Sequence, residues 1–150
     1  MPDPPHALTS NAGWEIENNF ILLKDIVCFL HQYGVRTSLF IDPQKISVAE
    51  IALLSAIGTD RVELYTERYA DTFGTESFEK IFVIYKNIAI AINTLGIGIN
   101  AGHDLNLDNL NFFVNNICIV EEVSIGHALI CDALRYGMKD TIVKYLNAII

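Results

Sequence analysis

The sequence predicts an α/β fold built on a parallel sheet, and three observations lead to that fold class. Short apolar runs of strand-forming residues alternate with longer stretches in which apolar residues recur every three or four positions. Enough chain separates each run from the next for the helical crossover that parallel neighbours require. The chain has 150 residues, 51% of them hydrophobic, so it can bury a sizeable core. Four complete strands are expected, at residues 35–41, 61–65, 97–101 and 118–125.

Five helices are expected around these strands, at residues 17–33, 47–57, 78–95, 107–115 and 126–150. Ser47 and Glu50 have the spacing of a capping box, which marks a helix start, and Gly58 is the glycine at which that helix stops. Gly137 is expected to bend the last helix. Residues 66–76 are rich in Thr, Gly and charge and predict a long loop after the second strand, where loops are often functional.

The composition excludes several classes of function. The net charge is −8 and the ten Lys and Arg residues are scattered, whereas a nucleic-acid surface needs them clustered. The apolar blocks are far shorter than the roughly 18 residues that span a bilayer, so no membrane segment is expected. The opening residues lack the basic start and apolar run of a secretory signal, which predicts a cytoplasmic location.

The cysteines and the short motifs give no support for a cofactor. Cys28, Cys118 and Cys131 lie in apolar surroundings without metal-ligand spacing, so they are expected to be buried free thiols. The sequence has neither a Gly-rich nucleotide loop nor a serine nucleophile elbow. We therefore expect no metal and no cofactor.

Three polar positions at the predicted strand ends are candidates for chemistry. His103 lies at the carboxyl end of a strand, where parallel sheets bind ligands, and an imidazole there can move a proton near neutral pH. Glu63 interrupts an apolar strand, so its carboxylate needs a partner or a polar barrel mouth. Gly126 and His127 open the last helix, whose N–H groups suit a phosphate. The simpler alternatives are a turn histidine, a solvent-facing glutamate and an ordinary Gly-His turn.

Five segments resemble the pyridoxine 5′-phosphate synthase family of vitamin B6 biosynthesis, in the family's order and near its spacing. They are PDPPHALTS (2–10), SLFID (38–42), VELYT (62–66), NAGH (100–103) and SIGHA (124–128). The resemblance covers essentially the whole chain. Members are (β/α)8 TIM barrels that condense 1-deoxy-D-xylulose 5-phosphate with 3-amino-2-oxopropyl phosphate, releasing phosphate and water. The resemblance thus implies an enzyme that binds small phosphorylated substrates and forms homo-oligomers.

The resemblance also implies roles for individual residues. His103 is similar to the family's proton donor, and Glu63 to the carboxylate that stabilises the transition state. Thr9 is similar to a ligand of the deoxyxylulose phosphate. Asp104 stands where many members have a Gly that contacts the same substrate, and a carboxylate near a phosphate weakens binding unless the contact is made by the backbone.

Gly126 and His127 are similar to the family's backbone site for the aminoketone phosphate, which agrees with the argument from the helix start. A different phosphate-binding barrel, such as a relative of indole-glycerol-phosphate or thiamine-phosphate synthase, would share this Gly-His start. Such a barrel has no reason to combine the Gly-His start with the Asn-Ala-Gly-His strand.

The family's first three strands and their catalytic residues have no counterpart in the sequence. Met1 stands where the family's fourth strand finishes, so residues 1–150 are expected to form a single domain, the carboxyl-terminal part of a TIM barrel. The barrel is then incomplete, with about four parallel strands and an apolar inner face left open. An alternative function follows, in which this chain is a catalytically incomplete half-barrel that only binds a phosphorylated ligand or pairs with a missing amino-terminal half.

Overall fold

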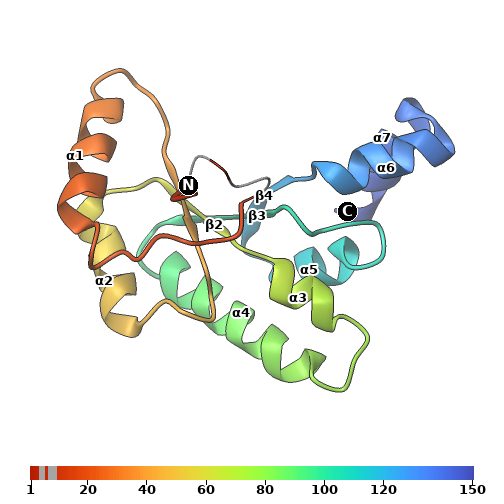
Figure 1. Ribbon diagram of the computed structural model, residues 1–150, viewed down its shortest axis with the longest axis horizontal. Coiled ribbons are helices and arrows are strands. Elements are labelled where there is room, and N and C mark those ends of the chain that lie inside the picture. The colour runs from red at the N-terminus through yellow and green to blue at the C-terminus, as the bar shows by residue number, and fades with distance from the viewer. Residues whose placement is uncertain (4–5, 7–9) are drawn as a thin grey trace.

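The computed structural model describes residues 1–3, 6 and 10–150, and a four-stranded parallel sheet lies at its centre (Figure 1). The strands are β1 (Ser38–Ile41), β2 (Arg61–Leu64), β3 (Gly98–Gly102) and β4 (Val120–Ser124). They lie side by side in chain order, and each neighbouring pair is parallel. Every crossover contains at least one helix. The predicted fold class is therefore confirmed.

The helices follow the predicted order with two differences. They are α1 (Phe20–His31), α2 (Val48–Ile57), α3 (Glu67–Thr72), α4 (Phe78–Asn93), α5 (Leu110–Asn116), α6 (His127–Tyr136) and α7 (Met138–Ala148). The segment expected to be a loop contains α3, because Tyr69 and Thr72 bury one face of a helical turn. The expected last helix is two helices, since Gly137 takes φ +82° between them.

The ends of α2 confirm the predicted signals. The Ser47 hydroxyl accepts from the Glu50 N–H, and the Glu50 carboxylate accepts from the Ser47 N–H, which completes the capping box. Gly58 ends the helix in the left-handed conformation. At α5 the N-cap is Asn109, and the Asn106 side chain accepts the Asp108 and Asn109 N–H groups in the turn before the helix.

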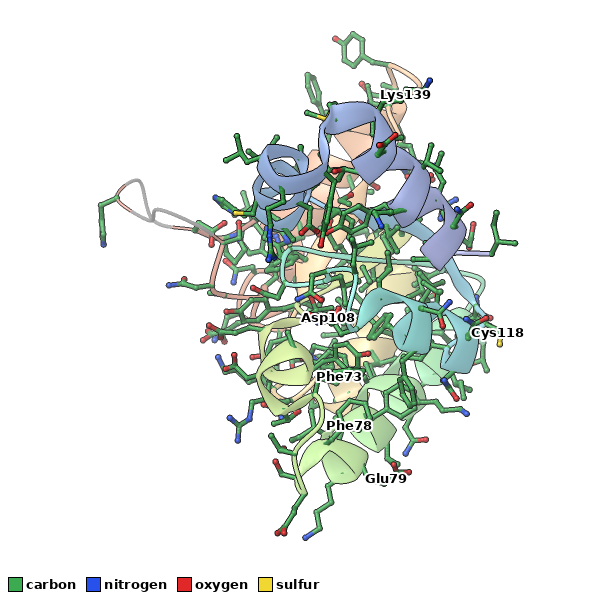
Figure 2. The ribbon with its side chains drawn as sticks, turned by 90° about the vertical axis from the view of Figure 1, so that its right-hand side faces the viewer. Phe73, Phe78, Glu79, Asp108, Cys118 and Lys139 are labelled. Carbon is green, nitrogen blue, oxygen red and sulfur yellow. The ribbon has the colours of Figure 1, made fainter. Side chains whose placement is uncertain are left out.

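One face of the sheet forms the core together with the helices. Leu39, Val62 and Ile99 are register partners on this face, and all three are buried. Beyond the sheet, aromatic rings join α3, α4 and α5 around Tyr69, whose ring centroid lies 4.8 Å from that of Phe113. Figure 2 shows Phe73 and Phe78 between α3 and α4. This aromatic cluster holds α3 in place after β2.

The opposite face of the sheet is polar, so the expectation of an apolar inner face is wrong. Arg61 donates to Asn100 and pairs with Glu121 at 2.7 Å. Arg36, just before β1, pairs with Glu122 on β4 at 2.8 Å although two strands lie between them. A side chain can join the first strand to the last only if the sheet curls, which is the curvature of a barrel wall.

The cysteines are also placed differently from the prediction. Cys28, Cys118 and Cys131 are free thiols, as expected, but all three are exposed, and Figure 2 shows Cys118 at the periphery. In α1 nearly every residue is apolar, and Ile21 and Phe29 are exposed as well, so an apolar neighbourhood in the sequence did not indicate burial. Within the described ranges, no helix has the length and apolar character needed to cross a membrane.

Candidate functional site

Glu63 and His103 form a hydrogen-bonded pair at the carboxyl edge of the sheet. Glu63 lies on β2, with its side chain on the polar face, and His103 directly follows β3. Their side chains meet at 3.1 Å between Glu63 Oε1 and His103 Nδ1, and are 17% and 24% exposed. The Phe40 ring lies 5.0 Å from the imidazole, centroid to centroid. The two side chains therefore lie on the same side of the sheet, and their catalytic roles remain predictions.

The pairing with Glu63 decides which ring nitrogen of His103 faces away from the carboxylate. A carboxylate accepts hydrogen bonds, so we assign the proton of the pair to Nδ1 of the imidazole. Nε2 is then the nitrogen that faces away from Glu63. A histidine held through one nitrogen by a carboxylate, with the other nitrogen directed at the substrate, is a common arrangement for proton transfer.

The backbone at His103 is held in an uncommon conformation. His103 has φ +55°, a region that residues with a Cβ seldom occupy. Its N–H donates to the Ser124 carbonyl at 3.2 Å, which joins it to the end of β4. A left-handed residue other than glycine costs of order 1–3 kcal/mol, and such residues concentrate at functional sites.

Gly102 makes room for this arrangement. A Cβ at Gly102 would stand 2.5 Å from the Ser124 carbonyl oxygen and 3.1 Å from Glu63 Oε1. The first distance is a clash with backbone, which cannot move aside easily. The glycine therefore allows β3, β4 and the Glu63 carboxylate to approach closely below the imidazole.

Asp104 lies next to the pair in an unusual environment. Its Oδ2 atom is buried and has no hydrogen-bond partner among the described residues. Burial raises the pKa of the Asp104 carboxyl above its usual range, and the negative charge of Glu67 raises it further, whereas His103 and His127 act in the opposite direction. Asp104 therefore keeps its proton to a higher pH than an ordinary aspartate does.

Gly126 and His127 are exposed at the start of α6, the helix that follows β4. In the described part of the chain, no side chain caps this helix start, and no atom lies within 4 Å of the place for a Cβ at Gly126. The His103 N–H donates to the carbonyl of Ser124, two residues before Gly126, so the two loops lie near each other. Thr9, the remaining predicted substrate ligand, lies outside the described residues.

Asn100 and Thr66 are two further polar residues near the site. Asn100, on the strand that leads to His103, bonds to Arg61 and Glu122 on the polar face. Thr66 was given no role, yet its buried hydroxyl contacts the backbone on both sides of His103. In the sequence, the only sign of this role is a threonine between a strand and a helix. That position does not reveal that its hydrogen-bond partners are Gly102 and Asp104, far along the chain.

No group of three or more His, Cys, Asp or Glu side chains is placed to hold a metal ion in the described part of the chain. The arrangement is suited to proton transfer by His103, with a carboxylate partner and a helix start nearby.

Comparison with known proteins agrees with the resemblance found in the sequence. The family described as "Pyridoxal phosphate biosynthesis protein PdxJ" matches residues 1–150. The pyridoxine 5′-phosphate synthase of Parabacteroides distasonis is 49% identical over 145 residues, which are 97% of this chain and 59% of the relative. That of Cytophaga hutchinsonii is 48% identical over 147 residues, covering 98% of this chain and 60% of the relative.

The chain therefore spans about 60% of the length of the curated relatives it matches. The match decides against the alternative of a different phosphate-binding barrel. With all 150 residues matched and nearly half of them identical to named relatives, the chain belongs to the PdxJ family of vitamin B6 biosynthesis, a TIM-barrel family.

Proposed function

We propose that this chain carries the proton-donor part of a pyridoxine 5′-phosphate synthase active site. The reaction condenses 1-deoxy-D-xylulose 5-phosphate with 3-amino-2-oxopropyl phosphate and releases phosphate and water. The observation that supports the proposal most is the Glu63–His103 hydrogen bond at the carboxyl edge of the sheet, where TIM-barrel enzymes have their active sites.

In this proposal His103 is the proton donor. Ring closure expels oxygen leaving groups, and an oxygen leaves more readily when a positioned acid protonates it. The protonated imidazole donates from Nε2, while Nδ1 stays bonded to Glu63. Glu63 stabilises the positive charge of the ring before transfer and keeps its orientation fixed, which is how a carboxylate contributes to the transition state here.

The substrate phosphates are assigned to the loops on either side of His103. The first N–H groups of α6, at Gly126 and His127, hold the aminoketone phosphate through the positive end of the helix. Thr9 and the backbone at Asp104 hold the deoxyxylulose phosphate. Because the pKa of Asp104 is raised, its side chain ionises, and begins to repel that phosphate, only at a higher pH than an ordinary aspartate would.

A graft into a complete relative tests the function. The 145 residues of the Parabacteroides distasonis synthase that match this chain are replaced by those of this chain, and formation of pyridoxine 5′-phosphate from the two substrates is followed. We expect the graft to be active. A folded graft that binds both substrates and forms no product would contradict the proposed function.

A second candidate is the catalytically incomplete half-barrel. It is favoured by the sheet order, because β1 and β4 each have only one neighbouring strand within the described residues. In this reading the purified chain binds a phosphorylated ligand and closes no ring by itself. Assaying the purified chain beside the graft separates the two functions, since turnover by the chain alone excludes the second.

A further inference from the structure

We infer that Thr66 is a positioning residue that holds the His103 backbone in its left-handed conformation and so sets the direction of the imidazole. The inference rests on the proposed function for the role of His103. It adds a residue to that site which the resemblance left without any role.

The Thr66 hydroxyl spans His103 from the neighbouring strand end. It donates to the carbonyl of Gly102, the residue before His103, and it accepts from the N–H of Asp104, the residue after it, at 3.4 Å. Thr66 is 0% exposed, so no water competes for either bond. A single side chain thus fixes the two peptide groups that flank the left-handed residue.

The position of Thr66 in its own helix makes this use of the hydroxyl distinctive. Thr66 is the N-cap of α3, and an N-cap threonine usually accepts an N–H of the first helical turn with its side chain. Here the side chain makes no cap bond, although the Thr66 carbonyl accepts the Ala70 N–H of the helix. The hydroxyl is directed to the end of β3 instead, and the first turn of α3 loses a stabilising bond in consequence.

The segment that carries Thr66 is itself held in place by neighbouring helices. The Tyr85 hydroxyl on α4 donates to the Tyr65 carbonyl at 2.8 Å, and the Tyr69 hydroxyl on α3 donates to the Asn109 carbonyl at 2.7 Å. On the far side of His103, the Ser124 carbonyl accepts the His103 N–H. The His103 backbone is therefore held on one side by Thr66 and on the other by Ser124. Thr66 acts through its side chain, whereas Ser124 acts through its backbone carbonyl.

The backbone conformation at His103 can be measured through the preference for glycine over alanine at that position. Glycine adopts a left-handed conformation without strain, whereas alanine does not. The variants His103→Gly and His103→Ala both lack the imidazole, so their difference in stability reports the backbone alone. Urea unfolding of the purified chain gives this difference, first with Thr66 and then with Thr66→Val.

With Thr66 present, we expect the His103→Gly chain to be favoured over the His103→Ala chain by about fourfold in the folding equilibrium constant, because the left-handed strain on alanine exceeds the extra freedom that glycine gives the unfolded chain. With Thr66→Val, we expect that preference to disappear, because the flanking peptides are no longer held. Thr72→Val is the matched control, since Thr72 is equally buried and its hydroxyl bonds only to carbonyls of its own helix. The control should leave the preference unchanged.

The imidazole provides an independent reading. In the otherwise unchanged chain, the ¹⁵N spectrum of labelled histidine should show His103 with its proton on Nδ1. Thr66→Ser keeps the hydroxyl and should keep this signature, whereas Thr66→Val should lose it. In the graft, Thr66→Val should lower kcat about 10²-fold with little change in KM, as a misplaced group does, and Thr66→Ser should restore it.

Three results would overturn the inference. The first is an unchanged glycine preference in Thr66→Val, and the second is an unchanged Nδ1 signature in that variant. The third is a Thr66→Val chain that does not fold while Thr72→Val does, because Thr66 would then be a general requirement of the fold. The two proposals can fail separately. If the graft is inactive while the glycine preference of the purified chain still depends on Thr66, the proposed function is refuted and the positioning role remains intact.

Discussion

Substitution of Gly102 by alanine should destabilise the chain and disturb the site above it. The new Cβ would stand 2.5 Å from the Ser124 carbonyl oxygen and 3.1 Å from Glu63 Oε1. Overpacking against backbone costs about 1–3 kcal/mol, whereas the reduced freedom of the unfolded chain returns about 0.4–1 kcal/mol. The net expectation is a loss of about 1–2 kcal/mol in the free energy of unfolding.

Gly98 on the same strand is the matched control. Its Cβ would meet Glu121 Oε1 at 2.7 Å and the Arg61 side chain at 3.1 Å, which are ends of flexible side chains that can swing away. Their ion pair is 46% exposed at Glu121 and 15% exposed at Arg61, so losing it costs about 1 kcal/mol, which the unfolded-state term offsets. Gly98→Ala should therefore be close to neutral.

Urea unfolding of the two variants and the unchanged chain measures the difference, and the histidine ¹⁵N spectrum reports whether Glu63 still holds Nδ1. Gly102→Ala should unfold at a lower urea concentration than Gly98→Ala and should lose the Nδ1 signature. Equal stability of the two variants, with the signature intact in both, would show that the close approach of β3, β4 and Glu63 does not require this glycine.

Three further predictions concern stability. Hydrogen bonds from Thr37 hold the pKa of Asp60 down at about 2, so Asp60→Asn should cost about 1 kcal/mol of unfolding free energy at pH 7. This cost should shrink as the pH falls from about 4 toward 2. A cost that does not change with pH would contradict this. Asp104 has a raised pKa, so Asp104→Asn should stabilise the chain at pH 7 but not below pH 4 in the same urea titrations. Tyr69→Phe should cost about 0.5–1.5 kcal/mol, because it removes one hydrogen bond to the buried Asn109 carbonyl, which keeps its bond from the Phe113 N–H. A neutral result in thermal unfolding would exclude a contribution of the Tyr69 bond.

The strands were predictable because local chemistry determines them. Pro43 and Gly58 mark the limits of runs whose β-branched residues favour a sheet. The helical stretches between these runs leave only parallel pairing of the strands. The α3 helix was not predictable, because it is stabilised by Tyr69 packing on rings from α4 and α5. Tertiary packing there overrides a sequence that favours a loop.

The site was predictable where strand alternation decides it. Glu63 falls on the polar face because its neighbours Val62 and Leu64 are buried on the other, and His103 follows from the carboxyl-edge rule. Thr66 was not predictable, because its partners lie on the next strand. The exposure of Cys28 was missed because α1 is apolar on nearly every side.

His103 is proposed as the proton donor in ring closure, and the His103→Asn variant of the graft checks that claim. Asparagine tolerates the left-handed backbone but cannot donate as an acid. We predict that product formation is lost while both phosphorylated substrates still bind, and that the control His31→Asn, far from the carboxyl edge beside Asp60, retains activity. Product formed by the His103→Asn graft at the rate of the unchanged graft would contradict the claim.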